Sequence, residues 1–155
     1  MYKRILVPYD GSPPSRAALR EAIDMAFDSG STLVILNVVS ELPLLMGSGA
    51  YVNYGDLAGI LMKTGEDLVK EAVGIAEKDG VTCESKVVDA GAMPVCDAIL
   101  DQIAALQCDL VVMGTHGRRG LKRLTLGSDA ELVVRRTTVP VMLAKAVEAP
   151  SKTTA

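Results

Sequence analysis

A glycine-rich basic segment at residues 111–128 carries the residue types that could bind phosphate. Its apolar start is typical of a strand covered on both faces, and Gly117 lets backbone amides approach a ligand without a Cβ in the way. The segment contains Gly114, Gly117 and Gly127. Capping the next helix does not require three glycines, so we interpret the segment as a loop that binds phosphate through backbone N–H groups.

Ser128 follows the last glycine and stands three residues before Glu131, which is the spacing of a capping box. This spacing predicts a helix that begins at Ser128 and directs its unpaired N–H groups toward the loop. The alternative is that Ser128 is only an N-cap. Asp129, in the first helical turn, should stabilise the empty protein by about 0.3–1 kcal/mol through the helix dipole. We expect the same carboxylate to oppose phosphate and to weaken its binding.

Four cations and the single histidine lie in the same segment. The cations follow Gly117: Arg118, Arg119, Lys122 and Arg123. They form either a solvated basic loop or a set of charges that balances polyphosphate, and the sequence leaves both interpretations open. His116 has no nearby partners at metal-ligand spacing, and the chain has no Gly-x-Ser-x-Gly nucleophile. We therefore expect no metal site and no catalytic residue here, and interpret His116 as loop structure beside a phosphate.

Asp10 ends the first predicted strand, after Pro8 and Tyr9 and before Gly11. One interpretation is a turn residue whose side chain accepts a hydrogen bond from nearby backbone. The other is a binding residue, because a carboxylate accepts hydrogen bonds from sugar hydroxyls. The residues themselves leave both interpretations open.

Short β-rich runs alternate with helical patterns along the chain. Strands are expected at residues 3–9, 32–39, 82–88, 109–114 and 139–145. Helices are expected from Pro13, capped by Ser12 and closed at Gly30, and at residues 56–79, 95–106 and 128–136. Inner faces are expected to carry Leu19, Ile23 and Phe27 in the first helix and Leu61, Leu68, Ala72 and Ala76 in the second. This alternation implies parallel crossovers and an α/β sheet with helices on both faces.

The spacing Gly-x2-Gly-x9-Gly-Ser, from Gly114 to Ser128, resembles the nucleotide-binding signature of the universal stress protein family. Residues 3–12 resemble the family's opening strand and turn, and residues 139–143 resemble its closing strand. The resemblance implies an adenine nucleotide alpha hydrolase-like fold, a five-stranded parallel open sheet in the order 3-2-1-4-5. In that order the chain reverses between strands one and four, where open α/β sheets bind ligands.

The resemblance also implies an ATP site, with the nucleotide bound alone or with Mg²⁺ held through its phosphates. Asp10 would read the ribose, while backbone near Tyr9 and Val38 would frame adenine. The family often has a histidine where this chain has Asn37. The expected binding residues are Pro8, Tyr9, Asp10, Val38, Met113, Gly114, His116, Gly117, Arg118, Gly127, Ser128, Asp129 and Ala130.

Composition limits the class of protein. The chain has 155 residues, enough for one domain, expected at residues 1–145 with a flexible tail at 146–155. Its net charge of −3 argues against a nucleic-acid partner. Three cysteines without a Cys-x-x-Cys pair indicate neither a disulfide framework nor a zinc ribbon. With no signal-like segment and no run of 18 apolar residues, we expect a cytoplasmic protein that does not contact membranes.

The expected function is an ATP-binding universal stress protein that acts as a nucleotide-responsive regulatory module, with slow ATP hydrolysis at most. The family resemblance implies a homodimer that pairs through the last strand, which runs from Val139 to Lys145. The alternative is a member that binds no nucleotide and acts as a dimeric interaction module. The glycine patterns of P-loop enzymes and of dinucleotide-binding enzymes are absent. A small flavodoxin-like electron carrier would need aromatic residues to stack a flavin, and these are scarce. The long apolar loop at residues 42–51 is expected to be a lid or a contact surface.

Overall fold

A computed structural model of the chain describes residues 1–40, 54–116 and 126–146. Its strands are β1 (Arg4–Pro8), β2 (Thr32–Val39), β3 (Cys83–Asp89), β4 (Leu110–Gly114) and β5 (Val141–Ala144). Its helices are α1 (Pro13–Ser29), α3 (Tyr54–Lys78), α4 (Val95–Ala105) and α5 (Ser128–Arg136). The expected long loop at residues 42–51 and most of the tail, residues 147–155, lie outside the described residues.

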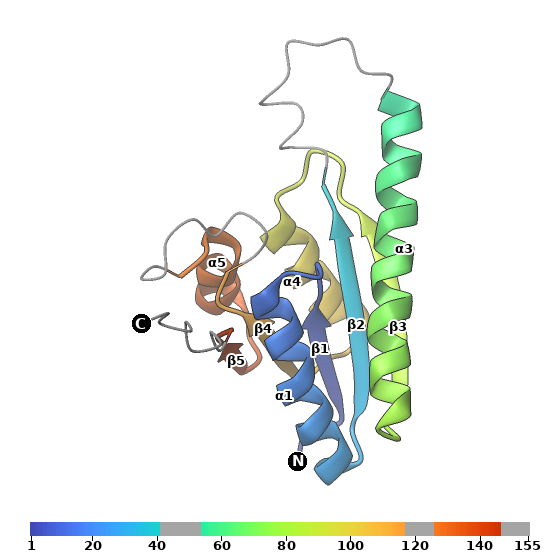
Figure 1. Ribbon diagram of the computed structural model, residues 1–155. Coiled ribbons are helices and arrows are strands. Elements are labelled where there is room, and N and C mark those ends of the chain that lie inside the picture. The colour runs from blue at the N-terminus through green and yellow to red at the C-terminus, as the bar shows by residue number, and fades with distance from the viewer. Residues whose placement is uncertain (41–53, 117–125, 147–155) are drawn as a thin grey trace, which may run out of the picture.

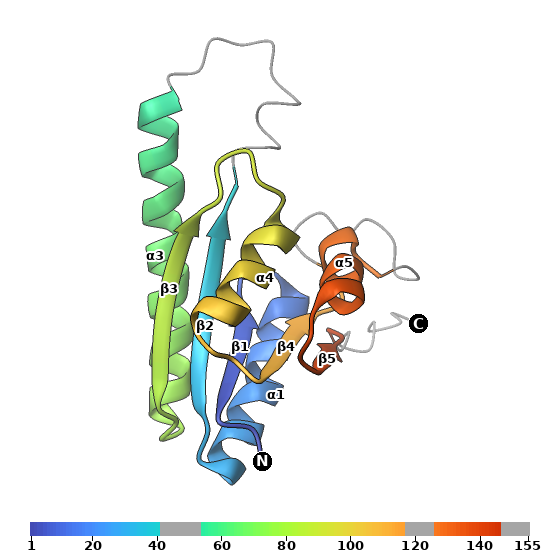
Figure 2. The ribbon, with the colours of Figure 1, turned by 180° about the vertical axis from the view of Figure 1, so that it is seen from behind.

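The five strands form one parallel sheet in the order β3-β2-β1-β4-β5, which confirms the predicted fold class and strand order. Helices α1 and α3 cover one face (Figure 1), and α4 and α5 cover the other (Figure 2). Because side chains alternate along a strand, Ile5 and Val7 pack in the α1/α3 layer and Leu6 packs in the α4/α5 layer. The central strands β1, β2 and β4 are buried on both faces, as expected for a helix-covered parallel sheet, whereas the edge strands β3 and β5 are more exposed.

Helix α1 has the predicted limits. The Ser12 side chain accepts a hydrogen bond from the backbone N of Ser15, and Gly30 ends the helix in the left-handed region at φ 68°. The prediction that Phe27 lies on the inner face is wrong, because its side chain is 67% exposed. Four residues advance a helix by about 400°, so each i+4 step drifts by roughly 40°. Two such steps from Leu19 turn Phe27 out of the core, and Ala26 takes the inner position.

Helix α3 packs its inner face on β2 and β3, where Ala72 and Ala76 are fully buried. Leu61 and Leu68, predicted on the same face, are half-buried. Both line a cavity at the end of the sheet. None of the helices that the structure describes combines the length and the apolar composition that crossing a bilayer requires.

Helix α5 begins at Ser128 as predicted, but the predicted capping box is wrong. The N-cap is Gly127, and no side chain caps the helix. Ser128 is the first helical residue, so Glu131 lies one position too late to complete the box. The Glu131 carboxylate instead pairs with Arg135 at 2.8 Å, one turn further along the helix.

Candidate functional site

A cavity of about 510 Å³ opens at the carboxyl ends of β1, β2 and β4, between α3 and the first turns of α4 and α5. The strand order makes this the switch point of the sheet, because β1 lies between β2 and β4. Predicted site residues that line it are Pro8, Tyr9, Asp10, Val38, Met113, Gly114, His116, Gly127, Ser128, Asp129 and Ala130. Gly117 and Arg118 lie outside the described residues, as do Arg119, Lys122 and Arg123.

One wall of the cavity was not predicted as part of the site. It comes from α3, through Leu61, Thr64, Gly65 and Leu68. In the sequence these residues indicate only a helix that faces the core. Periodicity predicts which face of a helix is buried, but it does not predict whether that face packs on the sheet or lines a cavity. On the opposite side, Val95 and Ile99 of α4 also line the cavity.

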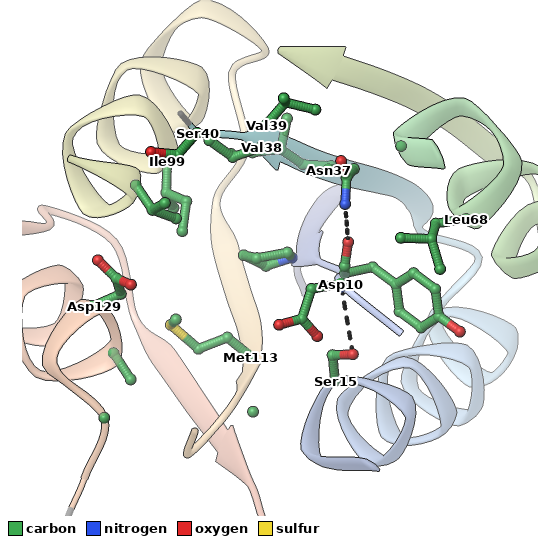
Figure 3. A pocket seen from close by; sticks show the side chains of 18 of the residues that line it. Asp10, Ser15, Asn37, Val38, Val39, Ser40, Leu68, Ile99, Met113 and Asp129 are labelled. Carbon is green, nitrogen blue, oxygen red and sulfur yellow. Dashed lines mark hydrogen bonds between the residues drawn. The ribbon is translucent and has the colours of Figure 1, made fainter. Parts of the chain in front are cut away.

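Asp10 forms the turn that leads from β1 into α1. Its Oδ1 accepts a hydrogen bond from the backbone N of Ser12 at 2.9 Å, and its own backbone N donates to Ser15 Oγ at 3.4 Å. The turn interpretation of Asp10 therefore holds. Figure 3 also shows its carboxylate pointing into the cavity on the side of Met113. A carboxylate has two oxygens and several lone pairs, so one such side chain can accept several hydrogen bonds.

Tyr9 lines the cavity, and its side chain packs in the core of the sheet. The residue is only 2% exposed and belongs to the α1/α3 layer. The hydroxyl donates to Glu71 Oε1 at 3.3 Å, and Arg16 pairs with the same carboxylate oxygen at 2.6 Å. Burial raises the pKa of the Tyr9 hydroxyl above its ordinary value. Tyr9 can therefore serve the site through its backbone.

Backbone groups of β2 reach the cavity because β2 extends beyond β1. The N–H and C=O groups of alternate β2 residues point toward β1, as the bonds from Thr32 N to Lys3 O and from Tyr9 N to Leu36 O show. Val38 is the next residue in this alternation and lies past Pro8, the end of β1. Its N–H and C=O are therefore directed to the cavity mouth beside Asp10.

The first turn of α5 lies at the other side of the cavity. Gly127 N donates to Thr115 O at 2.7 Å, which brings the start of α5 back to the end of β4. Ser128 is exposed. No side chain caps the helix, so its first turn offers N–H groups suited to an anion.

Asp129 has a role that the sequence did not indicate. Its Oδ1 accepts a hydrogen bond from Cys96 N at 3.3 Å, in the first turn of α4. Helix α4 has Pro94 as N-cap, with no side-chain cap bond of its own. The carboxylate therefore lies near the positive ends of two helix dipoles, which offsets part of its charge.

His116 continues β4 beside the cavity. Its Nδ1 lies 3.0 Å from Thr115 Oγ1. Its Nε2 is buried and makes no hydrogen bond within the part of the chain that the structure describes.

Gly114 ends β4 where α1 begins. A Cβ at Gly114 would lie 2.7 Å from backbone and side-chain carbons of Pro14. The close approach of α1 to β4 therefore requires glycine at this position, whatever the cavity binds.

The sequence and the fold both match known proteins. A family profile described as the universal stress protein family matches residues 1–145. Universal stress protein MJ0531 of Methanocaldococcus jannaschii is 31% identical over 145 residues, which cover 94% of this chain and 83% of that relative. The solved structure of hypothetical protein MJ0577 gives a TM-score of 0.80 at 24% identity, covering 96% of this chain and 99% of that one. A universal stress protein family protein from Arabidopsis thaliana with AMP bound gives 0.69 at 19% identity, with 97% of each chain covered.

Proposed function

This chain belongs to the universal stress protein family, and we propose that it binds ATP in the cavity at the ends of β1, β2 and β4. One observation carries the proposal: a single cavity of about 510 Å³ brings together the Asp10 carboxylate, the Val38 backbone and the start of α5. Small-molecule sites are clefts of this size with a few polar groups that converge on them. A similar fold with AMP bound supports an adenine nucleotide as the ligand class.

Each part of the nucleotide has a matching group. Adenine presents an amino donor beside ring-nitrogen acceptors, and the Val38 C=O and N–H can pair with such an edge. The Asp10 carboxylate accepts from ribose hydroxyls. The first turn of α5, which begins at Ser128, receives phosphate through its N–H groups and dipole. The proposal extends to Gly117 and Arg118 as phosphate contacts and to Mg²⁺ held through the phosphates.

The role that follows is a nucleotide-responsive regulatory module in the stress response. The proposal assigns no catalytic residue and allows slow ATP hydrolysis at most. It further includes a cytoplasmic location, one domain at residues 1–145 with a tail at 146–155, and a homodimer that pairs through the last strand. Strand β5 lies at the sheet edge, and Leu143 on it is 37% exposed. Unpaired edges and exposed apolar side chains favour such pairing.

The first experiment asks what the purified protein contains and binds. Acid extraction followed by mass spectrometry should release an adenine nucleotide, and calorimetric titration of the emptied protein should show ATP binding. A clean extract together with no heat of binding would contradict the proposal and favour the alternative, a dimeric interaction module without nucleotide.

A substitution at Asp10 tests how the sugar is bound. Asp10→Asn keeps an oxygen that can accept from Ser12 N and so preserves the turn. It removes the charge, so ATP binding should weaken by about 1.5–3 kcal/mol, as expected for hydrogen bonds to a charged group. Inorganic tripolyphosphate, which has no ribose, should bind as to the wild type. Equal weakening of both ligands would show that Asp10 does not contact the ribose.

A further inference from the structure

The β1–β2 ladder ends in an irregular way beside the cavity. Its last regular bond runs from Tyr9 N to Leu36 O at 2.8 Å. In a regular parallel ladder the next bond would join Val38 N to Tyr9 O. The described residues show a different bond at this place, because Asn37 Nδ2 donates to Tyr9 O at 2.8 Å. A side chain has therefore replaced a backbone rung (Figure 3).

Asn37 is held in this orientation from both sides. The residue is 6% exposed. Its Nδ2 faces the Tyr9 carbonyl. A carbonyl oxygen can only accept a hydrogen bond, so the NH₂ end of the Asn37 amide must point toward it. Its Oδ1 faces α3, where a Cβ on Gly65 would lie only 2.5 Å away. The amide is packed between the end of β1 and helix α3, with little room to rotate.

We propose that Asn37 is a positioning residue that keeps the base-reading edge of the cavity open. By satisfying the Tyr9 carbonyl, its side chain leaves the Val38 N–H for a ligand, and no buried carbonyl is left unpaired. The proposal rests on the proposed nucleotide site. In this proposal the Val38 backbone recognises adenine. The Asn37 amide keeps that backbone available to the ligand.

Removal of the amide tests the proposal. In Asn37→Leu, a side chain of similar size without a donor, the Tyr9 carbonyl becomes available and the Val38 N–H should close onto it. Affinity for ATP should fall by about tenfold, as expected for one lost hydrogen bond to a ligand. The preference for ATP over GTP should fall with it, and affinity for inorganic tripolyphosphate should stay the same. Asn37→Ala also removes the amide, and its small side chain cannot clash with α3. It should therefore show the same changes in affinity as Asn37→Leu.

Amide hydrogen exchange at Val38 gives a readout that loss of stability alone would not move. In the ligand-free wild type the Val38 N–H should exchange fast, and ATP should slow it. In both Asn37 variants it should already be slow without ligand. Ile35→Val is the matched control, since Ile35 is a fully buried β2 residue that does not line the cavity. It should lower stability and leave both Val38 exchange and the ATP-to-GTP ratio unchanged.

The outcomes separate this proposal from the proposed function. Fast Val38 exchange in the ligand-free Asn37 variants, or unchanged base preference, would overturn the role of Asn37 even if ATP binds. If the wild type binds no nucleotide, the nucleotide site fails, while the ligand-free exchange comparison still decides whether Asn37 holds the ladder open.

Discussion

Replacing Gly65 with alanine tests how closely α3 packs on the sheet next to the cavity. A Cβ at this position would lie 2.5 Å from Asn37 Oδ1, 2.9 Å from Val87 Cγ1 and 3.3 Å from Val39 Cγ2. The contact with Asn37 is roughly 1 Å shorter than an ordinary van der Waals contact. Neither Asn37 nor Val87 has a long flexible side chain, so the helix must move away from the sheet.

Two opposing terms set the magnitude. Overpacking a well-packed core costs about 1–3 kcal/mol, whereas alanine is favoured over glycine in a helix by about 0.8–1.0 kcal/mol. The net loss for Gly65→Ala should therefore be about 0–2 kcal/mol. The matched control is Gly74→Ala in the same helix, where the added Cβ would meet nothing within 4 Å. It should gain up to about 1 kcal/mol from propensity alone.

The difference between the two variants isolates the steric term, because the gain in helix propensity cancels. We expect Gly74→Ala to be more stable than Gly65→Ala by about 1–3 kcal/mol. Chemical denaturation measures this difference directly. In thermal unfolding it corresponds to roughly 2–4 °C per kcal/mol for a chain of this size. Equal stability of the two variants would refute the close approach of α3 to β2 on which the position of Asn37 depends.

Two other substitutions follow from contacts at the cavity. Gly114→Ala should destabilise the protein by about 1–3 kcal/mol in urea unfolding, because its Cβ would meet backbone atoms of Pro14 that cannot rotate away; wild-type stability would show that α1 can shift at no cost. Asp129→Asn keeps an acceptor for Cys96 N but removes a charge near the phosphate position, so it should tighten ATP binding by up to about tenfold at low salt. It should also lower the melting temperature slightly, because two helix N-termini lose a favourable charge. Unchanged or weaker ATP binding in that variant would mean that the carboxylate does not oppose phosphate.

Local signals predicted much of the framework. Ser12, Pro13 and Gly30 define the limits of α1 because caps and left-handed glycines act through their own backbone geometry. The glycine spacing after β4 located the start of α5 for the same reason. The predicted capping box was wrong, because the helix starts one residue earlier than the box requires: Ser128 is already helical and Gly127 is the N-cap. The prediction that Phe27 lies on the inner face was wrong because a four-residue spacing drifts around the helix.

The sequence by itself therefore determined the order of elements, their approximate limits and, through the family resemblance, the strand order and part of the cavity lining. Only the tertiary structure decided that α3 forms one wall, that Asn37 replaces a rung of the β1–β2 ladder, and that Asp129 caps α4. Periodicity and capping report interactions within a few residues of each other. Contacts such as Gly65 with Asn37, or Asp129 with Cys96, join distant segments, and they exist only because the sheet order and helix packing bring those segments together.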